Sequence, residues 1–151
     1  MVNTMKNIEK DFEDISPKEF LDFTCELDQI KEDLNSTNSA INRTIYMRIY
    51  YSVFLFLREW LKKFMNYESR KGEHTKLPRF IKKHGPFEDK KNKEIYRGLN
   101  ILKKLRHQAD YKLIIPPKNS LDYQKWEFTS ITSAFEIAED IIKTFNNYKS
   151  F

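Results

Sequence analysis

The chain of 151 residues has the length of one domain and is long enough to bury a core. Hydrophobic residues make up 40% of it and aromatic residues 15%, which excludes a disordered chain despite 32% charged residues. Three glycines are too few for the turns of an all-β protein or the phosphate loop of a dinucleotide-binding one. Composition therefore favours helices joined by polar loops.

The cysteine content and the apolar runs indicate a soluble, cytoplasmic protein. Cys25 is the single cysteine, so it can form neither an internal disulfide nor a cysteine-based metal site. The first residues reach several carboxylates before any apolar run, which is unlike a secretory signal. The longest uncharged apolar run, residues 49–57, is too short to cross a membrane.

The net charge of +5 is unevenly distributed along the chain. Residues 1–35 carry a net charge of −6, residues 36–112 carry +12, and residues 113–151 carry −1. A basic middle segment suggests a polyanionic partner, nucleic acid first. A solvated basic face, or one that pairs with the acidic first helix, would explain the same pattern.

The first half of the chain predicts two long helices. Residues 1–15 are expected to be loosely ordered, and Ser16-Pro17-Lys18-Glu19 then reads as a helix start with a capping box. Apolar residues at helical spacing carry this helix to about Leu34. A second helix, about Ala40 to Met65, is apolar on most of its circumference, which is typical of a central helix or of one that also packs a partner.

The second half predicts a polar connection and two further helices. Between residues 66 and 93 we expect at most one short helix, Leu77 to Lys83, with His74 and His84 in loops and no metal site. A third helix runs from about Lys93 to Tyr111 and is followed by Pro116-Pro117, which stop any helix. A fourth helix begins near Ser120 and contains Trp126. The expected fold is all-α, a single bundle of four to five helices over residues 1–151.

Arg106 interrupts the apolar stripe of the third helix. At helical spacing it shares a face with Ile95, Leu99, Leu102 and Ala109. An unpaired buried guanidinium is costly, so Arg106 must be paired below the surface or face a second chain. Asp110 is the nearest candidate partner, and His107 and Tyr111 lie on the adjoining face. Arg48 interrupts the apolar surface of the second helix, so it too must be paired or face a second chain. The cluster is either an active site or an ion-paired joint.

Two motifs in these helices resemble the HEPN-domain family. The run Arg48-Ile49-Tyr50-Tyr51-Ser52-Val53-Phe54 is similar to the Arg-x-Tyr-Tyr-(Ala/Ser)-x-Phe signature of the second HEPN helix. The run Leu105-Arg106-His107-Gln108-Ala109-Asp110-Tyr111 resembles the Leu-Arg-x-x-Ala-Asp-Tyr ending of the next long helix in one branch of the family. His74 is similar to a histidine that precedes the short helix there.

The resemblance implies an all-α up-and-down helical bundle that dimerises along the helices that carry the motif. In active HEPN proteins an Arg-polar-x-x-x-His motif from two chains forms an RNA-cleaving site that uses no metal or other cofactor. Many members are toxins or phage-defence components, often encoded beside a nucleotidyltransferase antitoxin. Here Arg106 matches the arginine and His107 the polar residue, whereas Tyr111 stands at the position of the histidine.

That departure leaves three functions open. One is a metal-independent endoribonuclease in which Arg106 holds the phosphate and His107 or Tyr111 assists, with RNA as substrate. Another is a catalytically silent module that binds RNA, a nucleotide or a nucleotidyltransferase, with Arg48, Asp110 and His74 as ligand-binding or ion-pairing groups. The third is a helical interaction protein whose polar interruptions mark an oligomer interface.

Overall fold

A computed structural model describes residues 16–31, 38–111 and 131–151 of the chain. These ranges contain helices and connecting turns but no strand, so the all-α prediction is confirmed for them. The helices are α2 (Pro17–Ile30), α3 (Asn38–Met65), α4 (Glu73–His84), α5 (Asp89–Tyr111) and α7 (Ile131–Tyr148).

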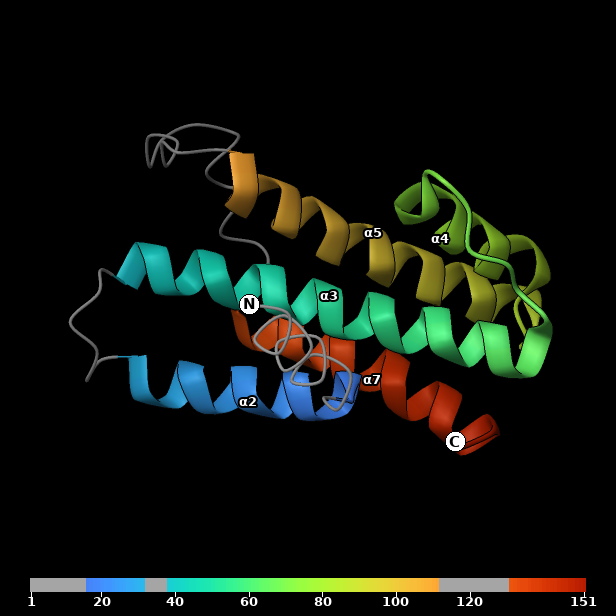
Figure 1. Cartoon of the computed structure of the whole chain (residues 1–151), viewed down its shortest axis with the longest axis horizontal. Coiled ribbons are helices and arrows are strands. Elements are labelled where there is room, and N and C mark those ends of the chain that lie inside the picture. Colours follow the sequence, from blue (N-terminus) through green and yellow to red (C-terminus); the bar gives the residue numbers. More distant parts are fainter. Residues whose placement is uncertain (1–15, 32–37, 112–130) are drawn as a thin grey trace, which may run out of the picture.

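The helices form a bundle around α3. Figure 1 shows α3 in the centre, with α2 and α5 on either side of it and α7 behind, and α3 packs against all three. Successive long helices run in opposite directions, which gives the up-and-down arrangement expected. The short helix α4 packs against α5 at the far end of the bundle.

The central position of α3 explains its broad apolar circumference. Its buried side chains cover most of the helix circumference and include Ile45, Tyr46, Ile49, Tyr50 and Trp60. Each side of the helix meets a different neighbour, so the prediction of a central second helix is confirmed.

The start of α2 follows the capping box read from the sequence. Ser16 Oγ accepts a hydrogen bond from the Glu19 N–H at 3.2 Å, and a Glu19 carboxylate oxygen accepts one from the Ser16 N–H at 2.9 Å. The helix ends at Ile30, before the predicted Leu34. The predicted disorder of residues 1–15 and the predicted start of the last helix, with Ser120 and Trp126, fall outside the described residues.

A short helix is present where the sequence predicted one, but it is longer than Leu77 to Lys83 and contains both His74 and His84, which were expected in loops. The helix begins at Glu73 after Gly72, whose φ of 80° marks the left-handed region that favours glycine. It passes through Pro78, which is buried with Leu77 and Ile81. Packing of these side chains against α5 outweighs the hydrogen bond that proline cannot donate. His74 therefore lies in the first turn of α4.

The connection between α4 and α5 is held by one buried amide. Asn92 Oδ1 accepts from the Phe87 N–H at 3.2 Å, and Asn92 Nδ2 donates to the carbonyls of Gly85 and Phe87 at 3.1 and 2.9 Å. The side chain is only 5% exposed. It explains why α5 begins at Asp89 rather than at the predicted Lys93, because the amide fixes the chain that leads into the helix.

Replacing Asn92 with alanine should lower the free energy of unfolding by about 2 kcal/mol or more, since buried groups of the connection lose their hydrogen bonds. Urea denaturation measures the change. Asn147→Ala, on the exposed surface of α7, is the control and should change the value by less than about 0.5 kcal/mol. Equal values for the two variants would show that the Asn92 hydrogen bonds do not stabilise the fold.

None of the helices in the described ranges combines the length and the apolar character needed to cross a membrane.

Candidate functional site

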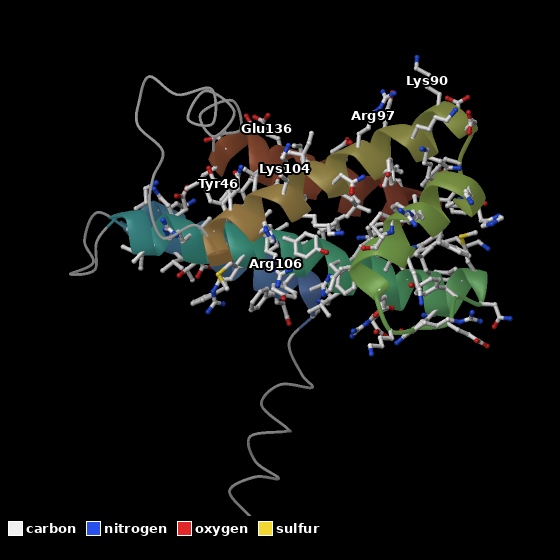
Figure 2. The ribbon with its side chains drawn as sticks, turned by 90° about the horizontal axis from the view of Figure 1, so that it is seen from above. Tyr46, Lys90, Arg97, Lys104, Arg106 and Glu136 are labelled. Carbon is white, nitrogen blue, oxygen red and sulfur yellow. The ribbon has the colours of Figure 1, made fainter. Side chains whose placement is uncertain are left out.

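Arg106 lies at the edge of the apolar stripe of α5 and reaches α3. Its neighbours on the stripe, Leu99, Leu102 and Ala109, are buried, while Arg106 itself is partly exposed. One guanidinium nitrogen, Nη2, donates to Tyr51 Oη at 3.0 Å, and the guanidinium carbon lies 5.2 Å from the centre of the Tyr51 ring. Figure 2 shows Arg106 projecting from α5 across α3. The arginine is thus held against an aromatic surface.

His74 meets the same aromatic surface from α4. Its Nδ1 is 2.7 Å from Tyr50 Oη. The imidazole is stacked on Phe54, with ring centres 4.3 Å apart, and it meets the Tyr51 ring edge-on at 6.0 Å. Residues of α3 therefore connect the start of α4 to Arg106 on α5.

Lys103 adds a second cation beside the start of α4. Its Nζ donates to Thr75 Oγ1 at 3.2 Å, and Lys103 precedes Arg106 by one turn of α5. The pKa of the His74 imidazole is lowered first by burial and further by the positive charges of Arg106 and Lys103. We call this group the basic aromatic cluster; it consists of Tyr50, Tyr51, His74, Lys103 and Arg106.

The hydrogen bond between Tyr50 and His74 fixes where the imidazole carries its hydrogen. Burial raises the pKa of Tyr50 far above its usual value, so the phenol keeps its hydrogen. Within the described part of the chain, His74 Nδ1 is the one hydrogen-bond partner of Tyr50 Oη. Tyr50 therefore donates to Nδ1, and the neutral imidazole carries its hydrogen on Nε2.

The other imidazole nitrogen is available to a ligand. Nε2 of His74 makes no hydrogen bond to any residue in the described ranges, and the side chain is partly exposed. Burial, together with the positive charges of Arg106 and Lys103, lowers the pKa of His74. At neutral pH the cluster thus offers an Nε2–H, a guanidinium and an ammonium, all of them hydrogen-bond donors.

The lowered pKa of His74 predicts that the protein loses stability as the pH falls below about 6.5, the usual histidine value. Between the folded pKa and that value the unfolded chain binds more protons, so the free energy of unfolding rises with pH. Urea denaturation at pH 5 to 7.5 measures the slope. His74→Gln should flatten this slope, while His107→Gln, at an exposed position, serves as the control. Equal slopes for the two variants would contradict the prediction.

Of the other predicted site residues, His107 lies beside the cluster. It is exposed and lines a shallow hollow of about 270 Å³ together with Lys103, Lys104 and Arg106. Arg48 lies over the rings of Phe20 and Phe23 on α2, at 4.9 and 5.4 Å. The helix α5 extends to Tyr111, but the side chains of Asp110 and Tyr111 lie outside the described residues, and so does the predicted ion pair of Arg106 with Asp110.

The sequence interpretation missed two features of the cluster. It named Tyr50 and Tyr51 only as part of the second-helix motif, whereas their hydroxyls bond to His74 and Arg106. It did not select Lys103, although a lysine one turn before Arg106 was a visible signal. In the ranges that the structure describes, no three His, Cys, Asp or Glu side chains are grouped as metal ligands.

No protein-family model matches the sequence, and no solved structure matches it. An uncharacterized protein of Methanocaldococcus jannaschii is 35% identical to the chain. The alignment covers 65% of this chain and 66% of that protein. The comparison provides a relative of similar sequence but indicates no function for the cluster.

Proposed function

We propose that the protein is a HEPN-like RNA-targeting protein that binds a phosphodiester at the basic aromatic cluster. The observation that carries the proposal is that Arg106 and a neutral His74 both contact the adjacent rings of Tyr50 and Tyr51, and that the His74 Nε2–H has no partner in the described ranges. A guanidinium matches the oxygens of a phosphate in two parallel hydrogen bonds. Lys103 supplies further positive charge at the same place.

The start of α4 favours an anion in the same position. The first N–H groups of a helix have no acceptor within the helix, and its dipole places partial positive charge there. In α4 the residue before the helix is Gly72, which provides no side-chain cap. The N–H groups of Glu73 and His74 thus add to the donors that a phosphate would meet.

The packing of the two HEPN-like motifs against each other supports the proposal that the protein is HEPN-like. Tyr51 of the α3 motif and Arg106 of the α5 motif are directly hydrogen-bonded, although 55 residues separate them. An up-and-down arrangement of the long helices agrees with the fold that the resemblance implies. On this proposal the protein acts as a dimer on RNA, as a toxin or defence component, and a nucleotidyltransferase is a possible partner.

Endoribonuclease activity without a metal is the second candidate function. It is favoured by the same neutral histidine beside an arginine, since cleavage needs a phosphate clamp and a proton acceptor for the 2′-hydroxyl. For Nε2 to accept that proton, the hydrogen bond to Tyr50 must reverse. The reversal leaves the buried Tyr50 hydroxyl hydrogen without its acceptor, which is costly. We therefore place binding first and cleavage second.

Fluorescence anisotropy with a labelled single-stranded RNA, measured at several salt concentrations, tests the proposal. Binding should weaken with salt, and Lys103→Gln should reduce the slope of log K against log salt concentration by about one. Lys90→Gln is the matched control, because Lys90 is an exposed lysine near the other end of α5, away from Arg106 (Figure 2). Absence of binding at low salt would refute the proposal.

The same RNA, analysed on a gel after incubation with a chelator, distinguishes the two functions. Cleavage products that disappear in His74→Gln would establish the ribonuclease. Intact RNA at every protein concentration would exclude it and leave binding.

A further inference from the structure

A second hollow lies between α2 and α3, next to the basic aromatic cluster. It has a volume of about 510 Å³, within the range of about 300–1,000 Å³ typical of ligand pockets. Its walls are mostly apolar and come from Phe20 of α2 and from Thr44, Met47, Tyr51 and Leu55 of α3, with Arg48 beside them.

Arg48 gives this pocket a positive charge that the described residues leave uncompensated. Its guanidinium lies over the rings of Phe20 and Phe23, and no carboxylate in the described ranges pairs with it. The natural complement of such a pocket has a flat apolar part for the walls and a negative charge for the cation.

Tyr51 connects the pocket to the cluster. Its ring lines the pocket, and its hydroxyl accepts the hydrogen bond from Arg106. A polyanion held by Arg106 is therefore positioned to place its next unit against Tyr51 and Arg48. A nucleotide has the required chemistry, because its base stacks on aromatic rings and arginine while its phosphates are negative.

We propose that the pocket between α2 and α3 binds an unpaired nucleobase of the RNA whose phosphodiester occupies the basic aromatic cluster. The inference rests on the proposed function and makes single-stranded RNA its substrate class. A duplex keeps its bases stacked inside the helix and cannot place one in such a pocket. The negative charge of RNA complements Arg48, which argues for RNA over a second copy of this basic protein.

The test compares a labelled single-stranded RNA with an abasic ribose-phosphate chain of the same length. The intact protein should bind the RNA about tenfold or more tightly than the abasic chain, because base stacking adds affinity that the backbone cannot. Thr44→Tyr places a ring at the exposed rim of the pocket. It should bring the ratio of the affinity for RNA to the affinity for the abasic chain close to one, without changing the binding of the abasic chain. Thr132→Tyr, at an exposed position of α7, is the matched control and should keep the ratio of the intact protein.

The possible results separate the two proposals. A ratio near one for the intact protein, or an unchanged ratio in Thr44→Tyr, overturns the nucleobase pocket while phosphate binding stands. Failure of both ligands to bind at low salt overturns the proposed function itself, and the pocket with it. A change of oligomeric mass in Thr44→Tyr, measured by light scattering, with the ratio unaltered, would make the pocket a contact between copies of the chain and also overturn the inference.

Discussion

Arg106→Gln should weaken the binding of single-stranded RNA about tenfold or more, because hydrogen bonds to charged groups contribute about 1.5–3 kcal/mol. Glutamine keeps a donor and much of the length of the side chain, but it cannot form the charged double hydrogen bond to a phosphate. Arg106 also contacts Tyr51, so the change removes the link between the phosphate site and the α3 aromatic surface. Fluorescence anisotropy at fixed salt measures the loss.

The matched control is Arg97→Gln, because Arg97 is an exposed arginine of the same helix. Its loss should weaken RNA binding only slightly, through the general reduction of positive charge. Circular dichroism verifies that both variants keep the helical fold. Equal losses for the two variants would mean that RNA responds to the overall charge of α5 and not to the cluster.

Trp60→Ala should lower the free energy of unfolding by about 3–5 kcal/mol, as removal of large buried rings does. The side chain is fully buried, and its ring centre lies 4.8 Å from that of Phe145 on α7 and 4.9 Å from that of Phe64. Trp60 Nε1 also donates to the Lys149 carbonyl at 2.7 Å. The residue thus attaches the end of α7 to α3, and urea denaturation of the variant measures its contribution.

Trp60→Phe separates the contribution of ring packing from that of the hydrogen bond to the Lys149 carbonyl. It keeps a ring in the core but loses the hydrogen bond to Lys149, so most of the stability should return. A loss below about 1 kcal/mol for Trp60→Ala would contradict the packing described here, because a residue at the centre of a core cannot be truncated at so small a cost.

The fold was largely predictable because its signals are local. The capping box at Ser16 and Glu19 placed the start of α2, and the apolar circumference of the second predicted helix identified the centre of the bundle. The start of α4 was not predictable in the same way. The sequence placed it at Leu77, one residue before Pro78, whereas the helix begins at Glu73, directly after Gly72.

The candidate site was predictable only in part. The interrupted apolar stripe drew attention to Arg106, and its partner was sought one turn away because helical spacing is all that a sequence displays. The structure brings Tyr51 and His74 to the same place from two other helices, which helical spacing within α5 could not indicate. Arg48 also interrupts an apolar helix surface in the sequence, but its side chain lies against α2. The two arginines are separated because α3 packs against α2 and α5 with different faces.

The central claim is that the basic aromatic cluster holds an RNA phosphodiester, and NMR of the His74 imidazole tests it most directly. The ring nitrogens of the free protein at pH 7 should report a neutral imidazole with its hydrogen on Nε2. Addition of single-stranded RNA should shift the Nε2 resonance, and the same RNA concentration should shift it far less in Arg106→Gln. RNA that binds while the Nε2 resonance of His74 stays in place would contradict the account.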